Sequence, residues 1–428
     1  MTEIVGKSVT KIDALSLATG DAKFVDDFNL PDTAIVKIMY SPHAHARIID
    51  IDTSEAESIE GVVDILCYKN VKRILHTTAG QGAPEPSPYD TVMFDNKVRF
   101  VGDRVAAVLA ENETIAIEAI SKIKVQYEIV PALLDYEKAM ESNTPIIHEE
   151  DDKYNPIQGY YLPEKNIAGH IEFHFGNLDQ GFKDADLVLD HTYRTGYASH
   201  CMIEPHSVFS YLDERNRLVI ISSTQVPFHV RRICAQLLEI PLSRIRVIKP
   251  RIGGGFGGKQ EVFLEYVAAL FTLRTNRPVK LILSREEVFK SSRTRHPMRV
   301  RCKTGIKKDG TITSIDYDVL MNTGAYGAHG LTVLTNAGSK VLPLVNKVPN
   351  IKFCAYSVYS NLPVGGAYRG YGVTQSMFAF GQQMDIMARA INMDVVDFYL
   401  QNQIREGETS AVFEYLGEGK AGTAMNIE

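Results

Sequence analysis

The sequence predicts an α+β protein with more than one domain, and three observations support that fold class. The chain has 428 residues, and at roughly 100–200 residues per domain this length corresponds to two to four domains. Apolar residues make up 45% of the chain and charged residues 23%, which are the proportions of a globular protein. Strand-type and helix-type patterns are mixed along the chain, and this mixture favours an α+β arrangement.

The first part of the chain predicts a small α/β domain over residues 20–140, after an N-terminal segment of residues 1–19. Residues 34–39 alternate apolar and polar side chains, and residues 46–51 resume this pattern after a turn at Ser41. We therefore expect two strands that pair with each other. A strand–helix–strand unit follows, with its elements at 105–109, 114–122 and 124–129.

Residues 141–166 predict a linker, because they are polar, rich in charge and proline, and without periodicity. A proline-dense stretch at 81–89 predicts a surface loop. The larger second domain, residues 167–428, has strand patterns at 187–194, 207–212, 218–223, 245–248, 279–283 and 311–320, and helix patterns at 228–238, 261–274 and 373–390. Its last residues, 417–428, show neither pattern, and we expect the chain to end at a subunit boundary.

The charge and cysteine content exclude several classes of partner. The 46 basic and 52 acidic residues give a formal charge of -6, so no basic surplus is available for nucleic acid. The 5 cysteines are scattered without a Cys-x-x-Cys pair, so no cysteine cluster predicts a zinc or iron–sulfur centre. No apolar run approaches the roughly 20 residues that span a bilayer, and we expect a cytoplasmic protein without a membrane partner.

The strongest local signal is a glycine loop at residues 253–258, followed by Lys259 and Gln260. So many glycines indicate a close backbone approach or positive φ angles. A helix expected from residue 261 would direct its N-terminal amides toward whatever the loop holds, which favours an anionic or electron-rich ligand.

Three other interpretations of this loop remain open at the level of sequence. Its glycines satisfy the dinucleotide pattern Gly-x-Gly-x-x-Gly, but residues 274–280 lack the acidic residue that this site needs. They also satisfy the start of a phosphate-binding loop, but Gln260 stands where a magnesium-binding hydroxyl is required. The third interpretation is a tight turn without a ligand.

A second glycine-aromatic stretch, Gly-Gly-Ala-Tyr-Arg-Gly-Tyr-Gly at residues 365–372, again precedes a helix pattern. Together with the triple-glycine Phe-Gly-Gly-Lys motif and with Ser-Thr-Gln at residues 223–225, it resembles the large molybdenum subunit of the xanthine dehydrogenase and aldehyde oxidase family. The segment at residues 6–27 is similar as well, although Lys11 replaces the usual arginine. The strand–helix–strand unit resembles the family's small α/β hammerhead domain. The resemblance covers nearly all of this chain but only the first half of a typical family subunit, so residues 167–428 correspond to the first part of the molybdopterin-binding domain.

This resemblance implies a molybdenum–pterin cofactor, which in most bacteria is molybdopterin cytosine dinucleotide. Gln225 matches the glutamine that hydrogen-bonds the oxo group of molybdenum, and Arg369 matches the arginine whose peptide approaches the metal's ligands. Gly255, Phe256 and Gly257 match the family's glycine-loop contact. These residues would surround the metal without binding it directly, because the dithiolene of the cofactor supplies the bonds.

For the substrate, the resemblance assigns Tyr371 to the aromatic wall that packs on a flat ring, and Gln260 to the position of a purine-binding glutamate. Gln260 carries no charge, and the next carboxylate, Glu261, is expected to point elsewhere. Counting back from the Pro-Asn-Ile segment at residues 349–351 places Ala337 where purine enzymes have an arginine. Both charged residues that bind the purine are therefore missing. The possible substrates are then a differently bound purine, such as xanthine or hypoxanthine, or another N-heterocycle such as nicotinate.

The resemblance also implies partner subunits. The family's general base is a glutamate in the C-terminal half of the subunit, so no catalytic residue is expected in this chain, and Gly417 and its neighbours are assigned no catalytic role. A second molybdopterin subunit would supply that glutamate, as in bacterial enzymes such as nicotinate dehydrogenase that divide the subunit in two. Iron–sulfur clusters and FAD would lie on further subunits. An aldehyde oxidoreductase subunit and a non-catalytic pterin-binding scaffold are the alternatives, and His200 and His206, which flank Glu204, are expected to have structural roles.

Overall fold

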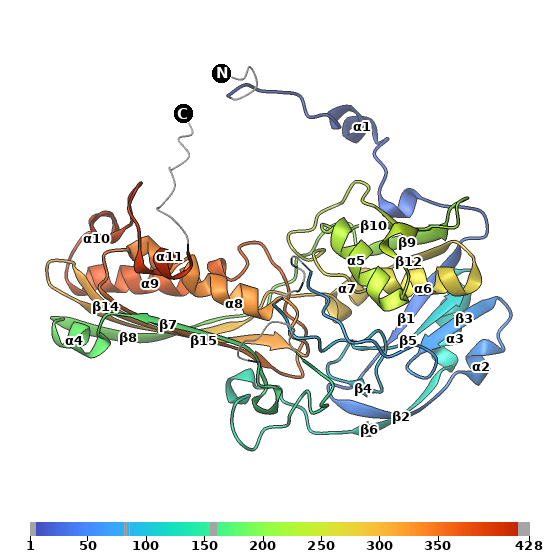
Figure 1. Cartoon of the computed structure of the whole chain (residues 1–428), viewed down its shortest axis with the longest axis horizontal. Coiled ribbons are helices and arrows are strands. Elements are labelled where there is room, and N and C mark those ends of the chain that lie inside the picture. Colours follow the sequence, from blue (N-terminus) through green and yellow to red (C-terminus); the bar gives the residue numbers. More distant parts are fainter. Residues whose placement is uncertain (1–5, 81, 83, 85, 155–160, 418–428) are drawn as a thin grey trace.

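The computed structural model describes residues 6–80, 82, 84, 86–154 and 161–417. The chain forms two lobes, each built on a β-sheet (Figure 1). The loops predicted at 81–89 and the linker at 141–166 are described only in part, and the end of the chain from residue 418 lies outside the described residues. No helix in the described part of the chain is both long and apolar enough to cross a membrane.

One lobe contains a seven-stranded sheet that combines strands from distant parts of the chain. In sheet order its strands are β11 (Ile245–Ile248), β10 (Leu218–Ser222), β9 (Ser207–Leu212), β12 (Val279–Ile282), β1 (Ala34–Tyr40), β5 (Arg104–Ala110) and β3 (Val62–Cys67). β1 and β12 are parallel neighbours, with Ala34 opposite Val279. Early and late strands of the chain therefore share one sheet and one core.

The predicted pairing of residues 34–39 with 46–51 is wrong. β1 lies in the seven-stranded sheet, whereas β2 (Ala46–Asp52) lies in a three-stranded sheet between β4 (Lys97–Val98) and β6 (Lys124–Ile129). After β1 the backbone of Ser41 hydrogen-bonds to Gly102 and Asp103 instead of closing a hairpin. These bonds direct the chain out of the first sheet and into the second.

The predicted strand–helix–strand elements are confirmed as β5, α3 (Glu113–Lys122) and β6, although the two strands belong to different sheets. The Asn112 side chain accepts a hydrogen bond from the Ile115 N–H and caps α3, as its position before the helix pattern predicts. The residues of β5 from Val105 to Ala110 are fully buried, as expected of an inner strand covered on both faces.

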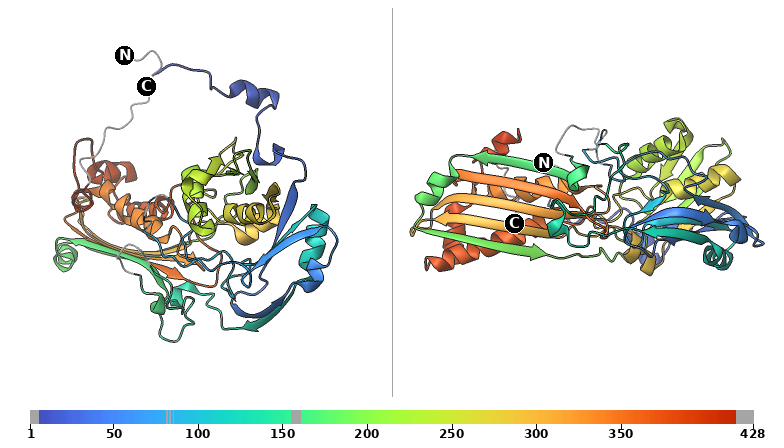
Figure 2. Two further views of the ribbon diagram at one scale, coloured as in Figure 1. Left: turned by 45° about the vertical axis from the view of Figure 1, so that its right-hand side comes forward. Right: turned by 90° about the horizontal axis from the view of Figure 1, so that it is seen from below.

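The other lobe contains a five-stranded sheet with its long helices on one face (Figures 1 and 2). The opposite, open face carries the short helix α4 (Leu178–Lys183) at one end, where Lys303 lies over the Phe182 ring. In sheet order its strands are β7 (Ile167–Phe175), β15 (Asn350–Tyr359), β14 (Ile312–Gly324), β13 (Met298–Ile306) and β8 (Leu187–Thr195). Strands β7, β13 and β15 were not predicted from the sequence. Each alternates apolar residues toward the helices with mostly polar residues toward the open face, which is the ordinary pattern of a strand with one buried face.

The helices pack on the two large sheets and close two main hydrophobic cores. Those on the seven-stranded side include α5 (Pro227–Leu238), α6 (Glu265–Thr275) and α7 (Arg285–Ser291), and those on the five-stranded side include α8 (Gly330–Ser339), α9 (Val373–Ala390) and α10 (Val395–Asn402). The remaining helices are short: α1 (Ala14–Thr19), α2 (Ser54–Glu57), α4 (Leu178–Lys183) and α11 (Ala411–Tyr415). The patterns at 228–238 and 373–390 are confirmed as α5 and α9, whereas α6 begins at Glu265 and not near residue 261.

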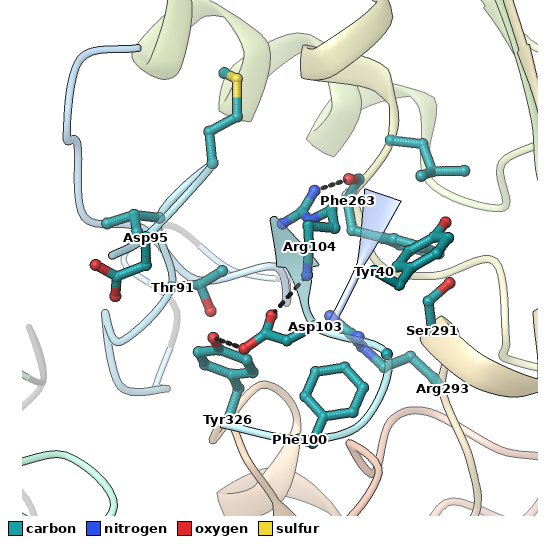
Figure 3. A pocket seen from close by; sticks show the side chains of 14 residues that line it. Tyr40, Thr91, Asp95, Phe100, Asp103, Arg104, Phe263, Ser291, Arg293 and Tyr326 are labelled. Atoms are coloured by element: carbon teal, nitrogen blue, oxygen red, sulfur yellow. Dashed lines mark hydrogen bonds between the residues drawn. The ribbon is translucent and has the colours of Figure 1, made fainter. Parts of the chain in front are cut away.

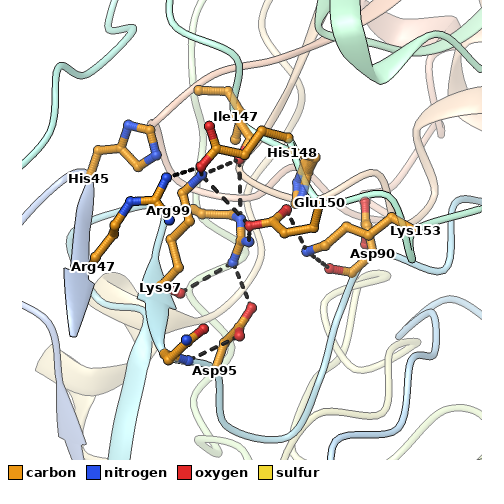
Figure 4. Close-up of polar contacts among 12 residues, drawn as sticks. His45, Arg47, Asp90, Asp95, Lys97, Arg99, Ile147, His148, Glu150 and Lys153 are labelled. Atoms are coloured by element: carbon orange, nitrogen blue, oxygen red, sulfur yellow. Dashed lines mark hydrogen bonds and ion pairs between the residues drawn. The ribbon is translucent and has the colours of Figure 1, made fainter. Parts of the chain in front are cut away.

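Part of the segment at residues 141–166 is packed against the domain, since Ile147, His148, Lys153 and Asn166 are buried. Arg99 is fully buried and donates hydrogen bonds to Asp95 (2.9 Å) and Glu150 (2.6 Å), and Lys153 is buried against the Asp90 carbonyl (Figure 4). Burial alone would raise the pKa of Glu150, but the cations around it lower that pKa to about 2. Two of the charged residues that suggest a linker in the sequence, Glu150 and Lys153, are thus partners in a buried network.

Candidate functional site

Two loops from different lobes meet at the candidate site: the glycine loop, residues 253–260, and the Tyr-Arg loop, residues 365–372. The backbone N–H of Arg369 donates to the Phe256 carbonyl at 2.9 Å. Gly257 has a φ of +98°, and a Cβ there would lie 2.5 Å from the Ala367 carbonyl oxygen. Only glycine permits this approach at that φ, so the sequence-level inference of a close backbone contact is correct.

A cavity of about 520 Å³ opens between these loops and helix α8. Its lining residues are Gln225, Phe256, Gly257, Gln260, Thr332, Thr335, Asn336, Ala367, Tyr368, Arg369, Gly370 and Tyr371. The structure thus brings together the residues assigned from the sequence to the cofactor and the substrate, except Gly255, which packs behind the cavity against Gln225.

A smaller cavity elsewhere cannot hold a cofactor. It lies between Arg104, Asp103 and Tyr326, and its volume is about 30 Å³ (Figure 3). Such a volume accommodates about one water molecule. Arg104 donates to the Phe263 carbonyl within one lobe, and Tyr326, which follows β14 of the other lobe, donates to Asp103 and so joins the two lobes.

Gln225 connects the end of β10 to the glycine loop. Its backbone N–H donates to the Lys259 carbonyl at 2.8 Å, and its side-chain Oε1 accepts from the Gly257 N–H at 2.9 Å. Because Oε1 is used by the loop, the assigned orientation of the amide leaves Nε2 as the group that can donate to a ligand in the cavity.

Two buried histidines support the loops from behind. His206 Nε2 lies 2.9 Å from the Gly258 carbonyl, and His200 Nε2 lies 2.8 Å from the Ala367 carbonyl, so each neutral ring can donate to one loop. Burial lowers the pKa of both, that of His206 to about 3. This geometry confirms the structural roles expected for both histidines.

We predict that replacement of His206 by glutamine makes stability less dependent on pH. The folded-state pKa of His206 lies below the unfolded value of about 6.5, so its stabilising contribution is complete above that pH and is lost as the pH falls toward 3. One such group contributes a slope of about 1.4 kcal/mol per pH unit in this window. Denaturant unfolding of both proteins between pH 7 and pH 5 measures the difference.

The matched control for this prediction is His174→Gln, because His174 is exposed on strand β7. It should unfold with the same pH dependence as the unaltered chain. Equal slopes for the His206 variant and the unaltered chain would contradict the assignment of a neutral, loop-supporting His206.

The phosphate-loop and dinucleotide interpretations of the glycine loop are wrong. Lys259 is buried and pairs with Glu204 at 2.7 Å, so its ammonium does not face the cavity. Helix α6 begins at Glu265, and the carboxylate of this residue accepts hydrogen bonds from the N–H groups of Phe263 and Leu264, both at 3.3 Å. Among the described residues that line the cavity there is none from the first turn of α6, so the expectation that this helix N-terminus would meet the ligand is also wrong.

Glu261 points away from the cavity, as expected from the sequence. It is buried beneath the glycine loop, where it accepts hydrogen bonds from Arg293 and from Thr78 (2.6 Å). Burial would raise the pKa of Glu261, but Arg293 lowers it overall. Gly366 of the Tyr-Arg loop lies against the same pair, since a Cβ there would be 2.6 Å from Glu261 Oε1.

Helix α8 supplies three cavity residues that were not predicted from the sequence. Thr332, Thr335 and Asn336 line the cavity, whereas Ala337, the position reached by counting back, is fully buried in the core. The polar residues at i, i+3 and i+4 lie on one face of a helix, and this spacing was the available signal. The Tyr371 hydroxyl contacts Thr332 (2.9 Å) and His329, which fixes the ring at the cavity wall.

The residues present fit a cofactor that brings its own metal ligands. Among the described residues that line the cavity there is no histidine, cysteine or carboxylate, and Arg369 is the one charged residue in that set. Within the described residues, no acceptor meets the backbone N–H groups of Phe256 and Gly370. Neutral donors around a close backbone approach suit an oxygen-rich or anionic group rather than a bare cation.

Comparison with known proteins agrees with this geometry. Residues 161–403 match the molybdopterin cofactor-binding domain, and residues 19–131 match the a/b hammerhead domain of aldehyde oxidase and xanthine dehydrogenase. The chain is 34% identical to the nicotinate dehydrogenase large molybdopterin subunit of Eubacterium barkeri, over all of this chain and 95% of that subunit. It is 39% identical to the probable hypoxanthine oxidase XdhD of Escherichia coli strain K12, over 99% of this chain. The chain spans 46% of the length of that E. coli protein.

The fold is also that of a solved oxidoreductase. Quinoline 2-oxidoreductase from Pseudomonas putida 86 superposes with a TM-score of 0.85 at 26% identity, over 95% of this chain and 51% of that one. The fold and the cavity thus define a molybdopterin-binding protein with a hammerhead domain. The chain belongs to the xanthine dehydrogenase and aldehyde oxidase family.

Proposed function

We propose that this chain is the molybdenum-cofactor subunit of a hydroxylase that oxidises an electron-poor C–H bond of an N-heterocycle, with water as the oxygen source. The observation that carries this proposal is the cavity between the two loops, with its neutral donors and aromatic walls. A molybdenum–pterin bound there would supply the two-electron oxidation, and molybdopterin cytosine dinucleotide is the form we propose.

The chain's own residues would hold and orient the reactants. Gln225 Nε2 and the N–H groups of Phe256 and Gly370 would donate hydrogen bonds to the metal's oxygen ligands, and the Arg369 peptide would lie beside them. These donors are fixed before any ligand binds, because the loops are bonded to each other and to Gln225.

The cavity walls favour a flat, polar ring as substrate. Tyr371 and Phe256 present aromatic side chains, and Gln260, Thr335 and Asn336 present groups that can both donate and accept hydrogen bonds. This combination suits ring nitrogens and exocyclic oxygens, so we propose a purine such as hypoxanthine or xanthine, or nicotinate. Relatives named for hypoxanthine oxidation and nicotinate dehydrogenation support that range.

Partner subunits would complete the enzyme. The described part of the chain places no carboxylate in the cavity lining, and a second molybdopterin subunit would contribute the glutamate that acts as general base. An iron–sulfur subunit and an FAD subunit would carry the electrons onward. The five cysteines, all described and all unpaired with one another, are in keeping with a reducing cytoplasm.

Metal analysis and a substrate panel on the complex purified with its partners test this proposal. We expect molybdenum and a cytosine nucleotide after acid release, and reduction of the enzyme by hypoxanthine, xanthine or nicotinate. Reduction by simple aldehydes alone would support an aldehyde oxidoreductase instead. Pterin without any turnover would support a scaffold, and absence of molybdenum and pterin would overturn all of these functions.

We predict that Gln225→Leu lowers kcat by about 10²–10³-fold in the complex, the effect typical of losing one preorganised donor at a reacting oxygen. Leucine also removes the acceptor for the Gly257 N–H, so the molybdenum content is measured alongside the rate and rates are expressed per molybdenum. Gln126→Leu, at an exposed position on β6, is the control and should retain full activity. A Gln225 variant with unchanged kcat would rule out this role.

A further inference from the structure

The open face of the five-stranded sheet brings together a histidine, a glutamate and a cysteine. His170 and Glu172 are two residues apart on β7, so their side chains point to the same face. Cys354 on β15 lies directly opposite Glu172, and Tyr356 lies opposite His170. The strand register itself therefore places the three groups side by side, at the sheet edge formed by β7.

The distances between the three ligand atoms are close to those of a tetrahedral metal site. Cys354 Sγ lies 3.7 Å from His170 Nε2, and His170 Nε2 lies 3.9 Å from Glu172 Oε2. Bonds of about 2.3 Å to sulfur and about 2.0 Å to nitrogen or oxygen, at tetrahedral angles, separate ligand atoms by roughly 3.3–3.6 Å. All three atoms lie within 4.8 Å of one another, so small side-chain rotations would complete the geometry.

The surroundings of this triad orient its ligands. The His170 ring stacks on Tyr356 with centroids 4.2 Å apart, which holds the imidazole plane. The other oxygen of Glu172, Oε1, lies 3.8 Å from Lys352 Nζ, so Oε2 is the atom that remains on the side of His170. Asp318 lies opposite Cys354 on β14, and its negative charge adds to that of Glu172 around a bound cation.

The triad is separate from the molybdopterin cavity. Alternate residues of β7, including Phe173, belong to the core beneath α8 and α9, and His170 and Glu172 therefore face the opposite side of the sheet. Figure 2 shows these helices on one face of the sheet. Helix α8, which lines the cavity, packs on the core side of the sheet. A metal held by the triad would therefore lie across the sheet from the cofactor.

We propose that His170, Glu172 and Cys354 form a zinc-binding site with a fourth position open to water. One thiolate, one imidazole and one carboxylate are the ligand types that zinc combines, and hard cations such as Mg²⁺ and Ca²⁺ disfavour such a set. Three protein ligands with an open position resemble a reactive zinc site more than a closed structural one.

A cobalt titration of the purified 428-residue chain, prepared without pterin, tests this site directly. Co²⁺ substitutes for zinc and reports its ligands. We expect one equivalent to bind with the visible bands of a tetrahedral ion and with a thiolate-to-cobalt charge-transfer band, both removed by added Zn²⁺. Cys354→Ser should abolish the charge-transfer band. His170→Asn should weaken zinc binding at least about 100-fold, because the loss of an outer partner alone costs about 10–100-fold.

Cys201→Ser is the matched control, since Cys201 is also solvent-accessible but lies outside the triad. It should leave the cobalt spectrum unchanged. Circular dichroism of each variant establishes that the fold is retained. Absence of a thiolate band in the unaltered chain, or its persistence in Cys354→Ser, would overturn the proposal. Because the chain in this experiment carries no pterin, the result is independent of whether the proposed hydroxylase function holds.

Discussion

A Gly257→Ala substitution is expected to separate the two loops and to abolish retention of the cofactor. The added Cβ would lie 2.5 Å from the Ala367 carbonyl oxygen and 2.9 Å from the Tyr368 nitrogen. Both are backbone atoms, so no side-chain rotation can relieve the contact. The φ of +98° adds about 1–3 kcal/mol of backbone strain for any residue with a Cβ. Molybdenum content per complex and thermal unfolding of the chain measure the two effects.

Two other glycines give a graded comparison. Gly196→Ala is the matched control, because a Cβ there meets nothing within 4 Å and its φ is not positive. A Cβ at Gly255 would lie 2.5 Å from Gln225 Oε1, which is at the end of a flexible side chain. Gly255→Ala should therefore lower molybdenum content and thermal stability by less than Gly257→Ala does. A Gly257→Ala complex with normal molybdenum content would show that the contact between the loops is not needed to hold the cofactor.

The glycine loop and its neighbours could be predicted from sequence because their signals are local. Five glycines in six positions indicate a close approach without any knowledge of the partner, and the structure supplies that partner as Ala367. Gln225 was found through its neighbours in the motif. The roles of these residues toward a cofactor remain predictions, since the structure shows their positions alone.

Features that depend on distant residues could not be predicted. β1 pairs with β12 across more than two hundred positions, and nothing within residues 34–40 specifies this partner over the nearby 46–51. The buried Arg99 network has the same cause, because a charged stretch indicates solvent exposure until its counter-charges are known. The polar residues of α8 that line the cavity, Thr332, Thr335 and Asn336, follow a helical spacing that is visible in the sequence. The residue at the position of the purine enzymes' arginine was instead located by counting along the chain, which led to the buried Ala337.

An Arg293→Met substitution is expected to destabilise the chain by about 3–5 kcal/mol, the cost of leaving one charge of a buried ion pair uncompensated. Arg293 and Glu261 are both buried, and Arg293 donates to Thr78 Oγ1 at 3.1 Å as well as to Glu261 (Figure 3 shows the arginine). The pair lies beneath both loops, since a Cβ on Gly366 would be 2.8 Å from Arg293 Cβ. Denaturant unfolding at pH 7 measures the loss.

Comparison with an ion pair on the surface shows whether burial causes the loss of stability in Arg293→Met. Arg389 and Asp385 form an ion pair on α9, with the Arg389 side chain 76% exposed, and Arg389→Met should cost no more than about 0.5 kcal/mol. The double variant Arg293→Met/Glu261→Gln should recover part of the lost stability, because it removes the orphaned carboxylate. Equal losses for the two arginine variants would contradict a buried pair.

The pH dependence of the same variant separates charge from packing. In the unaltered chain the folded-state pKa of Glu261 is lowered, so its contribution is complete above the unfolded value of about 4.3 and is lost as the pH falls through the lower folded pKa. Without Arg293, burial raises the pKa of Glu261 above the unfolded value. As the pH falls, Glu261 of the variant therefore takes up a proton, and the cost of its buried negative charge is removed. The stability difference between the two proteins should therefore narrow from pH 7 toward pH 4. A difference that stays constant with pH would mean that Arg293 stabilises the loops through packing alone.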